Sequence, residues 1–172
     1  MELALMRYKG ISLWCNPVSV EITTRRLTSD YTTYGYGEIH SDIGAGCAVI
    51  KGVLELRGEH CIDMYADLRK LQKDPGAGIL YVPGYQPIRA LFTKLKANAD
   101  ATPEKILCTF EFTEENSASE HKPRKSIHTA AEGETLFDIA YICGLKVDEL
   151  LKLNPQIRRP DEIAAGEKIK IC

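Results

Sequence analysis

The sequence predicts an α+β fold: an N-terminal antiparallel β domain with one helix, followed by a C-terminal βααβ module. Three observations predict it. Short stretches before residue 113 alternate apolar and polar side chains, which is the period of a half-buried strand. One stretch near the middle of the chain has apolar residues three and four positions apart, which is the period of a helix. A polar segment then separates these elements from a short final segment with its own strand and helix signals.

Several stretches of the N-terminal domain carry the strand pattern. In the first of them, Val20 and Ile22 alternate with polar residues. Along the fourth, the alternation places Leu91 and Leu95 on the face opposite Phe92, so that both faces carry apolar side chains. The strands are expected at residues 18–23, 47–57, 78–82, 87–96 and 105–112.

One helix and one long loop complete the predicted N-terminal domain. The apolar face of the helix consists of Cys61, Met64, Tyr65, Leu68 and Leu71. The helix is expected to end at the KDPG segment, residues 73–76, because a Pro cannot continue it. Residues 30–46 are rich in Tyr, Gly, Ser and Thr. Such a composition predicts a long hairpin loop between two strands of the sheet.

A polar segment divides the chain. Residues 113–126 contain no large apolar side chain. Such a segment cannot bury enough surface to fold by itself, which predicts a linker. The expected organisation is an N-terminal domain at residues 1–112, a linker at 113–126 and a C-terminal module at 127–172.

The C-terminal segment reads as strand, helix, helix and strand. Thr135 followed by Asp138 has the spacing of a capping box, so the first helix is expected to begin there. Gly144 is expected to end that helix in the left-handed conformation. A second helix carries Leu150 and ends at Asn154, and the alternating residues 168–171 predict the closing strand.

Four motifs of this segment resemble the LysM family. They are GETL at 133–136, IA at 139–140, LLKLN at 150–154 and GEKI at 166–169. Their order is similar to the LysM pattern along the full length of the module. Two positions depart from it: Ala130 and Ala131 replace more polar residues, and Lys146 stands where Ser or Thr often caps the second helix.

The resemblance implies a groove between two loops. In LysM modules this groove binds glycans that contain N-acetylglucosamine, such as peptidoglycan and chitin. The residues expected to contact a glycan or a docked protein are Gly133, Glu134, Thr135, Leu136, Asn154, Pro155, Gln156 and Ile157. Gly133, Thr135 and Asn154 are also what the fold requires for a turn, a cap and a helix end. Glycan binding and protein docking therefore remain alternatives for these loops.

The N-terminal domain resembles tail and baseplate proteins of contractile phages, phage-like bacteriocins and related injection systems. It is also similar to the N-terminal region of phage DNA-circularisation proteins. The segments that carry this resemblance are VIKG at 49–52, the helix face at 64–71, GAGILYVP at 76–83 and FEFTE at 110–114. The resemblance covers residues 13–114 and implies a tail-tube-like β domain.

Composition argues against several functional classes. The 172 residues have a net charge of −2 and no apolar run as long as a membrane helix, so neither nucleic acid nor a membrane is an expected partner. The N-terminal residues lack the pattern of a secretory signal, so synthesis in a bacterial cytoplasm is expected. The six cysteines lack metal-ligand spacing and are expected to be buried and reduced. No catalytic or cofactor motif is found, and no enzyme activity, metal or cofactor is expected.

Together these features predict a structural component of a phage or phage-like contractile tail, at its baseplate or tube end. The expected partners are tube, hub and wedge subunits and further copies of the chain in a homo-oligomeric ring, expected to be a hexamer. The expected location is the virion or tail particle. The alternative is a peptidoglycan-binding module that targets or anchors a partner acting on the cell wall. A third class, an enzyme accessory to wall hydrolysis, lacks an acid/base constellation.

Overall fold

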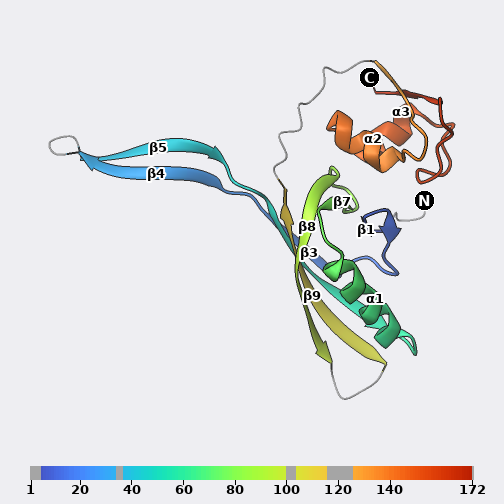
Figure 1. The fold of residues 1–172 in the computed structure, drawn as a ribbon, viewed down its shortest axis with the longest axis horizontal. Coiled ribbons are helices and arrows are strands. Elements are labelled where there is room, and N and C mark those ends of the chain that lie inside the picture. The colour runs from blue at the N-terminus through green and yellow to red at the C-terminus, as the bar shows by residue number, and fades with distance from the viewer. Residues whose placement is uncertain (1–4, 34–36, 100–103, 116–125, 172) are drawn as a thin grey trace.

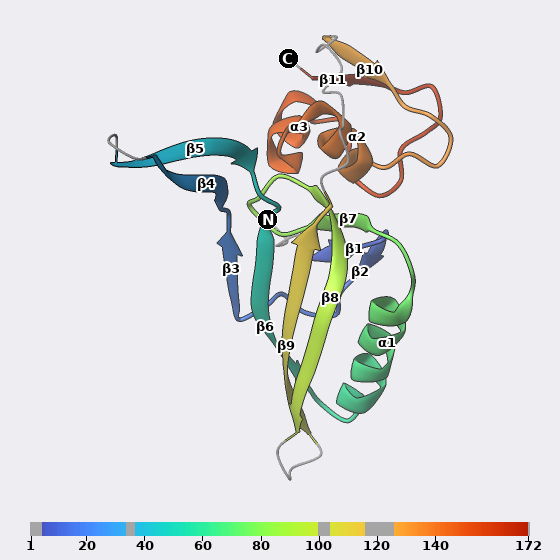
Figure 2. The same cartoon turned by 60° about the vertical axis from the view of Figure 1, so that its left-hand side comes forward.

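The computed structural model describes residues 5–33, 37–99, 104–115 and 126–171. Its main element is a seven-stranded antiparallel sheet with the strand order β2-β1-β7-β8-β9-β6-β3. The strands of this sheet are β1 (Arg7–Tyr8), β2 (Ile11–Ser12), β3 (Ser19–Thr23), β6 (Val49–Arg57), β7 (Gly78–Tyr81), β8 (Ile88–Ala99) and β9 (Lys105–Glu114). The single helix among the described residues of this domain, α1 (Cys61–Lys73), lies against one face of the sheet (Figures 1 and 2). The predicted α+β plan, with an antiparallel sheet against one helix, is confirmed.

The core lies between α1 and the sheet. Alternate residues of β9 face it: Ile106, Cys108, Phe110 and Phe112 are all buried, as the sequence alternation predicts. From α1, Leu68 is buried against them. Burial of one such Leu or Phe side chain contributes about 1.5–3 kcal/mol. The interleaved apolar positions of strand and helix therefore hold α1 to the sheet.

A bulge in β8 changes the faces predicted for this strand. The pairing of β8 with β9 shifts between Phe92 and Lys94, so Leu95 pairs with Phe110 on the core face. Leu95 is partly buried against the core, whereas Leu91 is exposed on the other face. The prediction that Leu91 and Leu95 share one face is therefore wrong.

A short hairpin at the start of the described chain was not predicted. β1 and β2 are joined by Lys9 and Gly10, which both have positive φ, 50° and 78°. This backbone suits a two-residue turn between antiparallel strands. The Lys9 ammonium group donates hydrogen bonds to the carbonyl oxygens of Asp74 (3.0 Å) and Pro75 (2.9 Å). The hairpin thereby holds the end of α1, where the helix carbonyl groups lack partners.

The segment predicted as a long loop is a two-stranded ribbon, so that prediction is wrong. β4 (Arg26–Thr33) and β5 (Gly37–Ala45) pair in antiparallel register and project away from the body of the molecule (Figures 1 and 2). The guanidinium group of Arg26 donates a 2.8 Å hydrogen bond to the Asp42 carboxylate at the base of the ribbon. Thr and Tyr favour extended backbone, and the described side chains of the ribbon, at residues 26–30 and 40–45, are mostly exposed and need no apolar alternation.

The other predicted strands are found with shifted ends. β8 continues to Ala99, and β9 continues to Glu114. β9 therefore includes the first two residues of the segment predicted as a linker at 113–126, and residues 116–125 of that segment lie outside the described residues. Among the described residues no helix combines the length and apolarity that a membrane crossing requires.

The C-terminal module has the predicted βααβ order. β10 (Ile127–Thr129) pairs with β11 (Lys168–Lys170), and α2 (Leu136–Cys143) and α3 (Val147–Leu153) lie between them in the chain. Thr135 and Asp138 form the predicted capping box, and Gly144 ends α2 with φ 65°. The buried core of the module contains Leu136, Ile139, Ala140, Val147, Leu150 and Ile169.

Candidate functional site

The first predicted loop is fixed by its own acidic side chain. The Glu134 carboxylate accepts a 2.8 Å hydrogen bond from the backbone N–H of Ala131. The same carboxylate lies 2.9 Å from Nε2 of His128 on β10. Gly133 is exposed and has φ 77°, which an L side chain rarely adopts. Glu134 and Gly133 therefore shape the loop, and the Glu134 carboxylate already has partners within the module.

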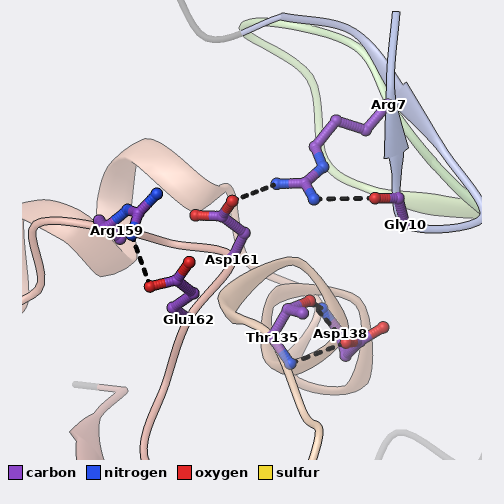
Figure 3. Close-up of polar contacts among 7 residues, drawn as sticks. All are labelled: Arg7, Gly10, Thr135, Asp138, Arg159, Asp161 and Glu162. Atoms are coloured by element: carbon purple, nitrogen blue, oxygen red, sulfur yellow. Dashed lines mark hydrogen bonds and ion pairs between the residues drawn. The ribbon is translucent and has the colours of Figure 1, made fainter.

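Thr135 and Leu136 connect this loop to the helix and to the segment that follows the second loop. The Thr135 hydroxyl donates to Oδ2 of Asp138 at 2.5 Å, and the Thr135 N–H donates to the same oxygen at 2.8 Å (Figure 3). Leu136 is fully buried, and its N–H donates to the carbonyl oxygen of Pro160 at 2.8 Å. The first loop is thus joined by a backbone hydrogen bond to the segment that follows the second loop.

Asn154, in the second loop, is buried with all of its amide groups paired. Its Nδ2 donates to the carbonyl oxygens of Leu150 and Lys170, each at 2.8 Å. Its Oδ1 accepts from the backbone N–H of Lys170, also at 2.8 Å. The side chain is 0% exposed. Asn154 therefore joins the end of α3 to β11 and is not on the surface of the module.

The remaining predicted residues of the second loop are more accessible. Pro155 and Gln156 are exposed, and Ile157 is half-buried against the core of the module. The Gln156 amide nitrogen donates a long hydrogen bond, 3.4 Å, to Oδ1 of Asn154. A ligand of these loops would therefore meet Gly133 on one loop and Pro155 and Gln156 on the other.

Two residues of the N-terminal domain also contact the first loop and α2, and the sequence analysis missed both. Tyr81, the last residue of β7, packs its ring edge-to-face against Phe137, with the ring centroids 4.9 Å apart. The Arg7 guanidinium lies 4.5 Å from the centroid of the same Phe137 ring. Arg7 also reaches within 3.9 Å of the Asp161 carboxylate, in the segment after the second loop (Figure 3). The C-terminal module is therefore packed on the N-terminal sheet.

A cleft of about 270 Å³ lies at this contact. Its lining comes from the N-terminal sheet, with Arg7, Lys9, Gly10, Ile79 and Tyr81, and from the module, with Gly133, Thr135, Phe137 and Asp138. Burial raises the pKa of Tyr81, and the nearby Asp148 carboxylate raises this pKa further. Tyr81 is therefore a neutral hydrogen-bond donor at any physiological pH.

A second, open cleft of about 480 Å³ lies on the sheet face opposite α1. It is lined by side chains of both charge signs, among them Glu21, Lys51, Lys94 and Glu111. The Lys94 ammonium group donates to both carboxylate oxygens of Glu111 at 3.2 Å. Paired charges of this kind are typical of a solvated face. Among the described residues no group of His, Cys, Asp and Glu side chains is arranged to hold a metal ion.

The family comparison concerns the C-terminal module. A family model described as the LysM domain matches residues 128–171. No curated protein matches the chain. The chain is also similar to one chain of a solved structure described as a virion of a native gene transfer agent (GTA) particle. This match covers 66% of the present chain and 91% of that chain, at 12% sequence identity and a TM-score of 0.44. Such a likeness does not establish a shared fold, so the family match alone bears on function.

Proposed function

Because residues 128–171 form a LysM domain, we propose that the protein is a non-enzymatic structural subunit of a phage or phage-like contractile tail. In this proposal the subunit lies at the baseplate or tube end, and its LysM domain docks against protein neighbours. The resemblance of residues 13–114 to tail and baseplate proteins is one support. The projecting ribbon of β4 and β5 is the structural observation that carries the proposal.

The ribbon lacks the packing that would stabilise it in an isolated subunit. Its strands have eight and nine residues, which corresponds to a length of about 27 Å. A two-stranded ribbon alone is at best marginally stable in water. Leu27 and Ile43 are exposed on it, and Ile43 is 64% exposed. Contact with neighbouring subunits would bury these side chains and stabilise the ribbon, as expected for a protein that functions in an assembly.

The edge of the large sheet supports the same proposal. β3 is the last strand of the sheet, and within the described residues it pairs on one side only, with β6. An unpaired edge accepts a strand from another chain. Repeated head-to-tail contacts of this kind close into a ring. We propose a six-fold ring, since the tail proteins that the N-terminal domain resembles have that symmetry.

Protein docking by the LysM domain is supported by the hydrogen bonding and burial of its loop side chains. Glu134, Thr135 and Asp138 are hydrogen-bonded within the first loop and helix. The Asn154 amide is buried and fully paired in the second. Few polar groups of the predicted groove therefore remain for sugar hydroxyl groups. The face of α2 beside the first loop already contacts protein, through Tyr81 and Arg7.

Incorporation into tail particles tests the assembly proposal. Ile43→Asp on the ribbon should leave a folded, soluble protein that is missing from tail particles purified from the producing bacterium. Deletion of residues 34–41 should have the same effect. Ile62→Asp is the matched control, because Ile62 lies on α1 and is similarly exposed, at 60%. Quantitative mass spectrometry of the particles gives the readout.

The assembly proposal fails if the wild-type protein is absent from purified tails. It also fails if the Ile43→Asp protein is incorporated as well as the Ile62→Asp protein. In the second case the ribbon would not be an assembly contact.

The alternative function is binding of peptidoglycan. The exposure of Gly133, Pro155 and Gln156 on the two loops favours it. Sedimentation of the purified protein with insoluble peptidoglycan measures this binding directly. Tight binding that is lost in the Gln156→Ala or Glu134→Gln variant would favour wall binding over protein docking. Of the two, Gln156→Ala is the cleaner variant, because Glu134 also holds the loop.

A further inference from the structure

We infer that the LysM domain is held rigidly on its own subunit by an intrachain interface, in which Tyr81 and Arg7 of the N-terminal sheet cover Phe137 of α2. The interface takes up the α2 side of the LysM domain next to the first loop. A neighbouring protein would then meet the domain on its remaining surface, which includes the exposed Pro155 and Gln156 of the second loop. This inference is independent of the particle in which the subunit is placed.

The position of Phe137 on its helix is the first observation. The stripe of α2 that faces the LysM core consists of Leu136, Ile139 and Ala140, which are all buried. Phe137 lies beside this stripe, at about 100° from Leu136 around the helix. It is nevertheless only 7% exposed. Its burial is explained by the residues from the N-terminal domain that cover its ring.

Tyr81 is the main residue that covers the Phe137 ring. It is 2% exposed although it ends β7, and it belongs to the same buried cluster as Leu136, Ile139 and Leu150 of the LysM domain. Its ring meets Phe137 edge-to-face at an interplanar angle of 61°, a favoured arrangement for aromatic pairs. A side chain of the N-terminal sheet therefore completes the LysM core.

Arg7 fixes the orientation by contacting two separate parts of the LysM domain. Its guanidinium lies over the Phe137 ring, at 4.5 Å, and one of its nitrogens is 3.9 Å from the Asp161 carboxylate. Another of its nitrogens donates to the carbonyl oxygen of Gly10 at 2.9 Å. Figure 3 shows the planar group held beside β1 by Gly10 and reaching Asp161 in the segment after the second loop. The Phe137 contact adds α2. Two contacts at different places resist rotation of the domain, which one contact would allow.

Nitrogen-15 spin relaxation of the full-length protein tests the inference. The wild type should show one rotational correlation time for residues 5–115 and for residues 127–171. The Arg7→Ala/Tyr81→Ala double variant should show two, with a shorter time for the LysM domain. Tyr85→Ala with Arg89→Ala is the control. Tyr85 is 50% exposed after β7, and Arg89 pairs with Glu115, which is not a residue of the LysM domain.

The chemical shifts of the LysM amides show whether the variants remain folded. In the double variant, dispersed LysM shifts with changes confined to α2 and residues 159–162 are expected. If Tyr81→Ala disrupts β7, the single variant Arg7→Gln replaces the double variant. Its amide chemical shifts are expected to change at both Phe137 and Asp161. Separate correlation times in the wild type would overturn the inference. Unchanged shared tumbling in the double variant, or Arg7→Gln shifts confined to β1, would overturn it too.

Discussion

At the scale of single residues, Asn154 illustrates how a family motif residue can serve the fold. Its buried amide pairs with one carbonyl group of α3 and with both backbone groups of Lys170 in β11. Asn154→Ala would leave these groups without partners. We expect a loss of about 2–4 kcal/mol in the free energy of unfolding of the LysM domain. Urea denaturation monitored by NMR signals of the domain measures it.

The neighbouring Gln156 provides the control for this prediction. Gln156 is exposed and makes one long hydrogen bond. Gln156→Ala should change the free energy of unfolding by no more than about 0.5 kcal/mol. Equal effects of the two substitutions would mean that Asn154 does not hold α3 to β11.

A second prediction concerns the small core of the LysM domain. Leu136 and Ile139 are fully buried on the core face of α2. Leu136→Ala or Ile139→Ala should cost about 2–5 kcal/mol, which is enough to unfold a domain with so small a core. Ile142→Ala on the same helix is the control, since Ile142 is 40% exposed. Thermal unfolding followed by the NMR signals of the LysM domain measures the effect. An unchanged melting temperature for Leu136→Ala would show that Leu136 is not a core residue.

A third prediction concerns the reactivity of Cys108. Burial, and secondarily the nearby Cys15 and Cys61, raise the pKa of the Cys108 thiol to about 11. Only the thiolate is nucleophilic, so at pH 8 about one thiol in a thousand is reactive. Iodoacetamide at pH 8 should leave Cys108 unmodified in the native protein and should modify it in urea. Peptide mass spectrometry measures both, and the half-buried Cys47 is the internal comparison.

Rapid native alkylation of Cys108 would show that the sheet opens at β9. Reaction of Cys108 at the rate of Cys47 would have the same meaning. Either result would contradict the packing of α1 on this strand.

At the scale of elements, the sequence predicted the helices and strands in which apolar side chains recur at a regular spacing. α1 ends where the KDPG segment begins, and β9 shows strict alternation of buried residues. The capping box and Gly144 placed α2 correctly, because each satisfies backbone groups of the helix ends in a way that depends on local sequence.

The elements that the sequence analysis missed are those stabilised by tertiary contacts. β1 and β2 have two residues each, which is too short for any period to appear. The described side chains of β4 and β5, at residues 26–30 and 40–45, are mostly exposed, so no apolar alternation marks these strands. The Lys9-Gly10 turn was the available signal for the first hairpin, and the Thr-rich and Tyr-rich composition was the signal for the second.

The sequence located both loops of the candidate site, but it did not distinguish their exposed residues from Asn154, which is buried. Contact of these loops with a ligand stays a prediction. Tyr81 and Arg7 lie far from residues 128–171 in sequence. Only the docking of α2 beside β7 brings them to Phe137, and the period of side chains along a single sequence carries no signal for such a contact.

At the scale of the whole molecule, the intrachain interface changes what cleavage of the predicted linker should produce. Trypsin is expected to cut after Arg124 or Lys125 and to release a C-terminal fragment of about 5 kDa under denaturing conditions. Under native conditions the fragment should co-elute with the N-terminal domain, because Tyr81 and Arg7 still hold it. Gel filtration of the digest at high protein concentration measures this.

The Arg7→Ala/Tyr81→Ala variant should instead release the fragment after the same digestion. A wild-type fragment that elutes separately would indicate a weak interface. If no fragment of this size forms even after denaturation, the segment at 113–126 is not the cleavable linker.

The ribbon also determines where mechanical tension enters the molecule. β4 follows β3 after two residues, and β5 is followed closely by β6. A pull on the ribbon by a neighbour is therefore transmitted directly to these two strands of the sheet. β6 is paired on both sides, with β3 and β9, whereas β3 is paired with β6 alone, from Ser19 to Thr23. Under load β3 should detach first, while β6 stays in place and the core under α1 remains intact.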